Sequence, residues 1–139
     1  MKTTIHTFLA LFVLALVPLA HAADKGAKPA VISQGAQIKL ADHLVAGKIT
    51  VFDFTSKYCP PCVRLSPSLD KLHAQRDDLA VVKVDINRPA TKGIDWKSPV
   101  AQQFGLKSIP HIKIYDAKGK LMSEGDKAMS TLMGWIGKL

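Results

Sequence analysis

The segment KYCPPCVRL, residues 57–65, contains the two cysteines of this 139-residue chain, Cys59 and Cys62, with two prolines between them. If the pair formed a purely structural disulfide, closing so short a loop would add only about 2 kcal/mol to the stability of the folded protein, the low end for disulfides. As a zinc site, the pair supplies two ligands, and structural zinc sites usually need about four. The spacing therefore favours a redox couple, in which two thiols form and break one disulfide without moving the rest of the fold.

The residues on either side of the pair predict a strand followed by a helix. Residues 49–54 (ITVFDF) are nearly all apolar and rich in β-branched and aromatic side chains, which is typical of a buried central strand. Residues 61–76 predict a helix with one apolar face, kinked at Pro67. Cys59 would lie at the N-terminal end of this helix, where free backbone N–H groups and the helix dipole favour a thiolate. Cys59 is therefore expected to attack a substrate disulfide, and Cys62 to resolve the mixed disulfide.

The rest of the chain predicts a strand at 79–84, a helix at 100–104, a hairpin of 111–115 and 120–123, and a last helix. The segment 87–98 between them resembles a loop. Ser98 and Pro99 are expected as N-cap and first helical residue of the short helix, and Asp126 as the cap of the last one. This order implies an α/β fold with a mixed sheet covered by helices on both faces.

The N-terminal residues have the pattern of a secretory signal peptide. Lys2 is followed by an uncharged apolar run at 8–17, and small residues stand at both positions of the Ala20-His21-Ala22 end. A membrane-spanning helix needs about 20 apolar residues, which this run does not reach before Pro18 interrupts it.

Three segments are expected from this pattern. They are a signal peptide over residues 1–22, a flexible leader over 23–36 and a domain over 37–139. Cleavage near Ala22 would give a periplasmic or secreted protein.

The charge pattern limits the partners that can be expected. The net charge is +8, and the lysines are spread along the chain instead of forming a cluster with interleaved aromatic residues. Nucleic-acid binding would need such a cluster, so we expect no nucleic-acid partner. No dimerisation segment is visible, and a monomer is expected.

Four features in register with the cysteine pair make the chain resemble thioredoxin from residue 49 to its end. They are Asp53 six residues before the first cysteine, the aromatic Tyr58 directly before it, Pro67 five residues after the second, and Ile109-Pro110 at the position of the family's cis-proline. The resemblance implies a thioredoxin-like three-layer α/β sandwich and a protein-disulfide oxidoreductase that needs no organic cofactor or metal.

The resemblance also implies roles for residues around the sulfurs. Asp53, between apolar neighbours, would be desolvated with a raised pKa, and would relay the proton of Cys62. The Ile109-Pro110 peptide would pair with an extended substrate, and Tyr58 would shape the surface beside Cys59. His111 is expected to be a solvated strand residue.

Some features depart from thioredoxin itself. The dipeptide between the cysteines is Pro-Pro instead of Gly-Pro, Tyr58 replaces Trp, and the segment at 87–98 is longer. With the signal peptide, these features are similar to secreted CPPC proteins of the TlpA and cytochrome-c maturation group. Because proline has no backbone N–H, the Cys59 thiolate loses a possible hydrogen bond. We therefore expect a reducing couple that acts on protein disulfides and is reset by a membrane electron donor of the periplasm.

Other functions share parts of this pattern. An oxidase or isomerase of the same fold would carry the same motif. A copper chaperone on a thioredoxin scaffold could use the two soft thiolates for Cu(I), with His111 as a further ligand. Known copper carriers of this fold space their cysteines more widely, which speaks against this alternative.

Overall fold

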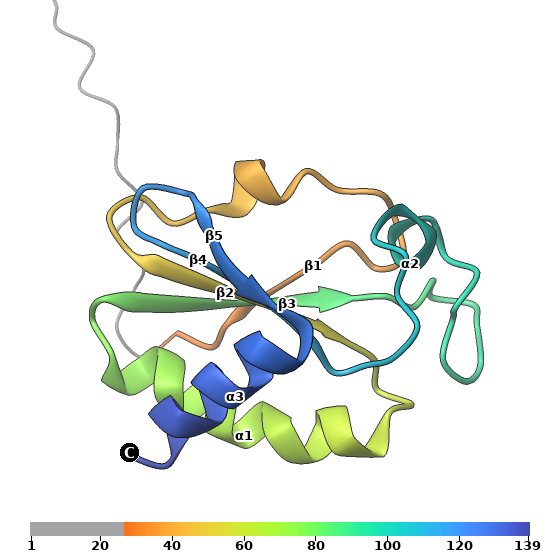
Figure 1. Ribbon diagram of the computed structural model, residues 1–139. Coiled ribbons are helices and arrows are strands. Elements are labelled where there is room, and N and C mark those ends of the chain that lie inside the picture. Colours follow the sequence, from red (N-terminus) through yellow and green to blue (C-terminus); the bar gives the residue numbers. More distant parts are fainter. Residues whose placement is uncertain (1–26) are drawn as a thin grey trace, which may run out of the picture.

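The structure, a computed structural model, describes residues 27–139 (Figure 1). The signal peptide expected over residues 1–22 lies outside the described residues. The elements are β1 (Ala30–Ile32), the 3-10 helix η1 (Leu40–His43), β2 (Ile49–Thr55), α1 (Pro60–Gln75), β3 (Leu79–Asp85), α2 (Pro99–Gln103), β4 (His111–Tyr115), β5 (Leu121–Glu124) and α3 (Gly125–Ile136).

The strands form one mixed sheet in the order β1-β3-β2-β4-β5. β3 lies parallel to both β1 and β2, whereas β4 runs antiparallel to β2 and to β5. Helices α1 and α3 cover one face, while η1 and α2 lie on the other side (Figure 1). This is the three-layer α/β sandwich that the sequence predicted.

Strand β2 lies at the centre because both of its faces are buried. Side chains alternate along a strand, so Val51 packs toward α1 and α3, whereas Phe52 and Phe54 pack toward η1 and α2. Asp53 is on the same face of the strand as Val51. The sequence of β2 is therefore almost continuously apolar, as expected for a strand covered on both sides.

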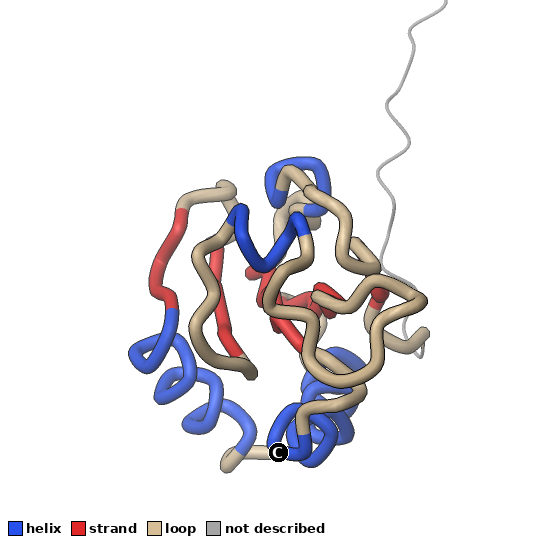
Figure 2. The backbone as a smooth tube through the Cα atoms, turned by 90° about the vertical axis from the view of Figure 1, so that its right-hand side faces the viewer, coloured by secondary structure: helices blue, strands red, loops and turns tan. Residues whose placement is uncertain are grey.

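The loops that matter for function leave the sheet at one edge. Thr55 and Asp85 are paired at the ends of the parallel strands β2 and β3, and His111 at the start of antiparallel β4 pairs with Phe54. The segments at 56–59, 86–98 and 105–110 therefore begin or end at the same edge. Figure 2 looks at this end of the molecule and shows these loops together with the short helix α2.

The expected domain boundary at residue 37 is wrong. Residues Ala30–Ile32 form β1, which pairs with β3 from Ala30↔Val82 to Ile32↔Val84. The turn after β1 is also bound to the end of β3, because the Gly35 N–H donates a hydrogen bond to the Asp85 carbonyl oxygen at 3.0 Å. A strand of three residues is too short to show a periodicity in the sequence, so residues 30–36 resembled part of the leader.

Of the two expected N-cap residues, Ser98 is confirmed and Asp126 is wrong. The Ser98 hydroxyl oxygen accepts a hydrogen bond from the Ala101 N–H, and Pro99 is the first residue of α2, as predicted. Asp126 is not the cap of the last helix, because β5 runs into α3 without a loop and Glu124 occupies the N-cap position. The Glu124 carboxylate pairs with Lys113 of β4, and Asp126 lies in the first turn of the helix.

Candidate active site

Cys59 is the N-cap residue of α1, and its sulfur is bonded to that of Cys62 in the first turn. The two Cα atoms are 5.2 Å apart, and the two residues are 2% and 1% exposed. The Cys62 N–H lies 3.2 Å from the Cys59 sulfur and donates to it. Pro60 and Pro61 bring no N–H to this turn. Cys62 is therefore the single backbone donor that the first three helical residues offer to the sulfur of Cys59.

The same donor would act on a thiolate after reduction. A side-chain acceptor at an N-cap bonds to the N–H of the second or third helical residue, and Cys62 is the third. The helix dipole also favours negative charge at this end. Both interactions stabilise the ionised form of Cys59, which is the nucleophilic form of a cysteine.

The Ile109-Pro110 peptide bond is cis, as the resemblance implied. The Ile109 carbonyl oxygen lies 3.6 Å from the Cys59 sulfur, although the two residues are far apart in the sequence. β4 begins directly after this peptide at His111, so the sheet holds the turn beside the disulfide.

Asp53 is fully buried, and neither of its carboxyl oxygens has a hydrogen-bond partner within residues 27–139. Burial raises the pKa of Asp53 from 3.8 to about 7, against the opposing charge of Lys83, which lowers it. Lys83 is the residue opposite Asp53 in the β2–β3 register. The expected desolvated acid with a raised pKa is therefore present.

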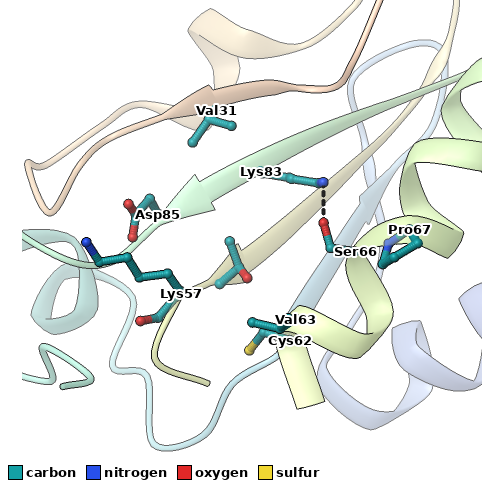
Figure 3. Close-up of a pocket in the computed structure, with 10 residues that line it drawn as sticks. Val31, Lys57, Cys62, Val63, Ser66, Pro67, Lys83 and Asp85 are labelled. Carbon is teal, nitrogen blue, oxygen red and sulfur yellow. Dashed lines mark hydrogen bonds between the residues drawn. The ribbon is translucent and has the colours of Figure 1, made fainter. Parts of the chain in front are cut away.

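A cavity of about 390 Å³ opens beside Cys62 (Figure 3). Its walls come from β1, from the end of β2, from α1 and from β3, and they include Val31, Lys57, Val63, Ser66, Lys83 and Asp85. The Lys83 ammonium donates a hydrogen bond to the Ser66 hydroxyl oxygen at 2.6 Å across this space (Figure 3). Cys62 is itself one of the residues that line the cavity.

Tyr58 lies at the surface directly before Cys59. Its side chain is 37% exposed, and the Lys57 ammonium lies 5.1 Å from the centre of its ring. The Tyr58 N–H donates to the Ser56 hydroxyl oxygen, which fixes the backbone ahead of the helix. Tyr58 is thus placed where it could contact a substrate.

His111 is half-buried instead of being a solvated strand residue, so that expectation is wrong. Its ring centre lies 5.8 Å from that of Phe54. Burial lowers the pKa of His111, and the charge of Lys113 acts in the same direction. His111 is paired with Phe54 in the β2–β4 register, so the two side chains lie on the same face of the sheet.

Two kinds of feature are absent from residues 27–139. No three side chains of histidine, cysteine, aspartate or glutamate lie close enough together to hold a metal ion. None of the helices described is both long enough and apolar enough to cross a membrane.

The surroundings of Asp53 on β3 and α1 were not predicted from the sequence. Lys83 interrupts the apolar run of β3, and a lysine in a buried strand is an unusual feature that points to a partner. Its partners, Ser66 and Asp70, lie on α1. No spacing in the sequence connects them to Lys83, because the contact depends on how the helix lies on the sheet.

The position of the disulfide defines the class of protein. It closes within the first turn of one helix and so joins no two elements. The cis Ile109-Pro110 peptide lies beside it, and strand β2, which leads to it, carries a buried acid with a raised pKa. Such a site is that of a thiol–disulfide oxidoreductase.

Comparison with known proteins supplies the family. The sequence model of the family described as Thioredoxin matches residues 36–138. The chain is 33% identical to a thioredoxin of Chlamydia muridarum over 103 residues, which are 73% of this chain and 92% of that protein. It is 28% identical to a thioredoxin of Streptomyces clavuligerus over 95 residues, covering 68% of this chain and 73% of the other. The chain belongs to the thioredoxin family.

Solved structures agree with the fold. The thioredoxin of Trichomonas vaginalis superimposes with a TM-score of 0.55 at 22% identity, covering 79% of this chain and 96% of that one. Thioredoxin f2 of Chlamydomonas reinhardtii gives a TM-score of 0.53 at 24% identity, with coverage of 79% and 94%. The protein is thus a thioredoxin-family disulfide oxidoreductase with the thioredoxin fold, and this family acts on protein disulfides.

Proposed function

We propose that the chain is a periplasmic or secreted member of the family that reduces protein disulfides, with Cys59 as nucleophile and Cys62 as resolving thiol. The observation that carries this proposal is the position of the Cys59 sulfur, 3.2 Å from the Cys62 nitrogen and 3.6 Å from the Ile109 carbonyl oxygen. The first contact stabilises a thiolate, and the second places the Ile109-Pro110 backbone beside it, where a substrate could pair with it.

The reaction proceeds in two exchanges. The Cys59 thiolate attacks one sulfur of the substrate disulfide, and the other substrate sulfur leaves as a thiolate. Cys62 then gives its proton to the Asp53 carboxylate, and its thiolate attacks the Cys59 sulfur of the mixed disulfide. The second substrate sulfur leaves, and the Cys59–Cys62 disulfide forms. Two electrons have passed from the cysteine pair to the substrate.

Asp53 suits the proton transfer because its pKa of about 7 lies near neutral pH. A general base or acid works best when its pKa is close to the working pH, since it can then both take and return a proton. Cys62, the other partner in this transfer, lines the cavity, whereas Asp53 does not.

The substrate would dock at the surface next to Cys59. An extended segment could pair with the backbone at Ile109-Pro110, and Tyr58 would border it on the side of α1. A main-chain interaction of this kind gives affinity for many sequences, and side-chain pockets add selectivity.

The reducing direction follows from the few donors near Cys59. A less stabilised thiolate means a less stabilised reduced form, and the couple is then a better reductant. In the periplasm, the oxidised pair would be reset by a dithiol of a membrane electron donor, as for the TlpA and cytochrome-c maturation group, and the protein would act as a monomer.

The proposal is tested by trapping mixed disulfides. Cys62→Ser can attack a substrate but cannot resolve the product, so it should accumulate mixed disulfides through Cys59. Cys59→Ser, the matched control, should accumulate none. Non-reducing electrophoresis followed by mass spectrometry measures both. Equal trapping by the two variants would overturn the assigned order of nucleophile and resolving thiol.

The direction has a separate test, the reduction potential of the Cys59/Cys62 couple against glutathione. A value close to thioredoxin's, about −270 mV, supports a reductase. A value near about −120 mV, at the oxidase end of the scale, would overturn it.

Within residues 27–139, no contact favours the copper-carrier alternative. His111, the residue expected to complete such a site, has its ring against Phe54.

A further inference from the structure

Among the described residues, the charged group that acts on Asp53 is Lys83. Lys83 lies opposite it on β3, and it is the group whose charge acts on the carboxyl. On the other side, β4 brings Ile112 into register with Asp53. From α1 and α3, the same face of the sheet is covered by apolar side chains, among them Leu69, Leu72, Ala128 and Leu132. Within the described residues, the state of Asp53 therefore depends on where the ammonium of Lys83 lies.

That ammonium is bound to other partners. It donates to the Ser66 hydroxyl oxygen at 2.6 Å and to a carboxylate oxygen of Asp70 at 2.5 Å. The Lys83 side chain is only 12% exposed, so its position is determined by these contacts. Ser66 and Asp70 are four residues apart on α1 and lie on the same side of the helix. Figure 3 shows Lys83 and Ser66 pointing toward one another at the cavity wall.

Asp53 receives no hydrogen bond from Lys83, even though the two residues are opposite one another in the sheet. We infer that Ser66 and Asp70 are positioning residues, which hold the Lys83 ammonium on α1 and keep the Asp53 carboxyl without a donor so that it can carry a proton. This inference rests on the proposed relay function of Asp53.

Releasing the ammonium has a defined consequence. A cation free to approach a carboxyl group to about 4–6 Å lowers its pKa by about 1–3 units. Asp53 would then stay ionised at neutral pH. It could still accept a proton from Cys62, but would not return one during the reverse exchange.

The test is a pH titration of the Asp53 carboxyl by carbon NMR in the oxidised protein. Ser66→Ala removes one of the two contacts without changing any charge, and it should lower the pKa of Asp53 by about one unit. Asp70→Asn, a second variant, should lower it further. Ser68→Ala is the matched control, because it makes the same change two residues along the same helix, and it should leave the titration unchanged.

Repeating the titration in a protein that also carries Lys83→Met shows whether Ser66→Ala changes the pKa of Asp53 by way of Lys83. Lys83→Met should raise the pKa of Asp53, and Ser66→Ala should have no further effect in that background. An unchanged titration in Ser66→Ala, or an equal shift with and without Lys83, would overturn the inference. In the reduced protein, the acid limb of the pH–rate profile should move to lower pH together with the titration.

The titration does not depend on turnover, so the two proposals can fail separately. If Cys62→Ser traps no mixed disulfide but Ser66→Ala still moves the titration of Asp53, the positioning role stands and the proposed function falls. If trapping succeeds and the titration does not move, the proposed function stands and the positioning role falls.

Discussion

A carboxyl group that is buried without a hydrogen bond destabilises the folded state once it ionises, and Asp53 is such a group. Its pKa in the folded protein is about 7, compared with an ordinary value of 3.8. The folded state therefore binds a proton that the unfolded state has already lost. Stability is highest below about pH 4 with respect to this group, falls as the pH rises, and levels off above about pH 7.

We expect the free energy of unfolding of the oxidised protein to fall by about 4 kcal/mol over this range through Asp53. In Asp53→Asn this contribution should be absent. The half-buried histidines with lowered pKa, His73 and His111, act in the opposite direction but are present in both proteins. Urea unfolding at several pH values measures the difference. Parallel curves for the two proteins would mean that Asp53 is hydrated in solution.

The two prolines between the cysteines, Pro60 and Pro61, lead to a prediction about the reduction potential. The N-cap position of Cys59 makes Pro61, the second helical residue, the one whose missing N–H could reach the sulfur. Pro61→Ala should therefore add a donor to the Cys59 thiolate. A hydrogen bond to a charged group contributes about 1.5–3 kcal/mol, and about 1.4 kcal/mol corresponds to about 30 mV for a two-electron couple.

Pro61→Ala should thus lower the pKa of Cys59 and make the couple more oxidising by about 30–60 mV. Pro60→Ala is the control, because the N–H of the first helical residue is not the one that an N-cap side chain accepts. Equilibration with glutathione measures both potentials. The same shift in both variants would show that helix propensity, and not the added donor, is responsible.

Single residues were predicted best where the chemistry needs a particular residue type at a fixed spacing. The cysteine pair, the acid in β2 and the proline before β4 all follow this rule, and the structure brings them to the same edge of the sheet. The partners of Lys83 follow no spacing. They depend on which turn of α1 lies over β3, which is a property of the assembled layers.

At the scale of elements, the turn after β1 makes a close contact with the loop after β3. Gly35 has a φ of +82°, and a Cβ atom on it would lie 2.7 Å from the Arg88 backbone nitrogen. Real side chains do not approach backbone so closely, so the turn would have to move away from β3. The position therefore requires glycine for two reasons, the backbone angle and the contact.

Gly35→Ala should destabilise the protein by about 3 kcal/mol, of which about 1 kcal/mol comes from the left-handed backbone and the rest from the clash. Gly47→Ala is the matched control, since Gly47 has a φ of +73° and open space around its Cβ position. It should lose only about 1 kcal/mol. Urea unfolding of the two variants gives the comparison. Equal losses would mean that residues 33–36 are not held against Arg88.

Elements with strong hydrophobic patterns were predicted to within about a residue or two at their ends, as for β2, β3 and α1. β1 was missed because its three residues are not distinctive alone, and its stability comes from pairing with β3. The segment at 87–98 was expected to be a loop, and it is one, but it is tightly held. Asp95 is buried and accepts hydrogen bonds from Arg88 at 2.7 and 2.9 Å. Arg88 lowers the pKa of Asp95 to about 2.

For the whole molecule, the sequence predicted the number of layers but not the order of the strands. The order of elements along the chain implied a mixed sheet, and the sheet is mixed. That the first strand lies at the edge beside β3 could not be read from the chain, because β1 itself was not recognised.

Export is the prediction that concerns the whole chain. If residues 1–22 are a signal peptide, the mature protein should begin at Ala23, as found by mass spectrometry of the exported product. Ala22→Arg should block the processing, since the peptidase reads small residues at that position. A full-length product retained in the membrane would contradict the prediction and would indicate an anchored protein.

The two ends of α1 have different surroundings. The helix has 16 residues, which corresponds to a length of about 24 Å. The sulfurs are at its start, whereas Leu139 lies near its other end, where its carbonyl oxygen accepts a hydrogen bond from Lys71 at 3.3 Å. Figure 1 shows the C-terminus at the side of the molecule opposite the start of α1. If the protein were attached to beads through Leu139, the end of the molecule that carries the start of α1 would point away from the bead. Such a support could capture large, folded client proteins that a linkage near β1 and the cavity would obstruct.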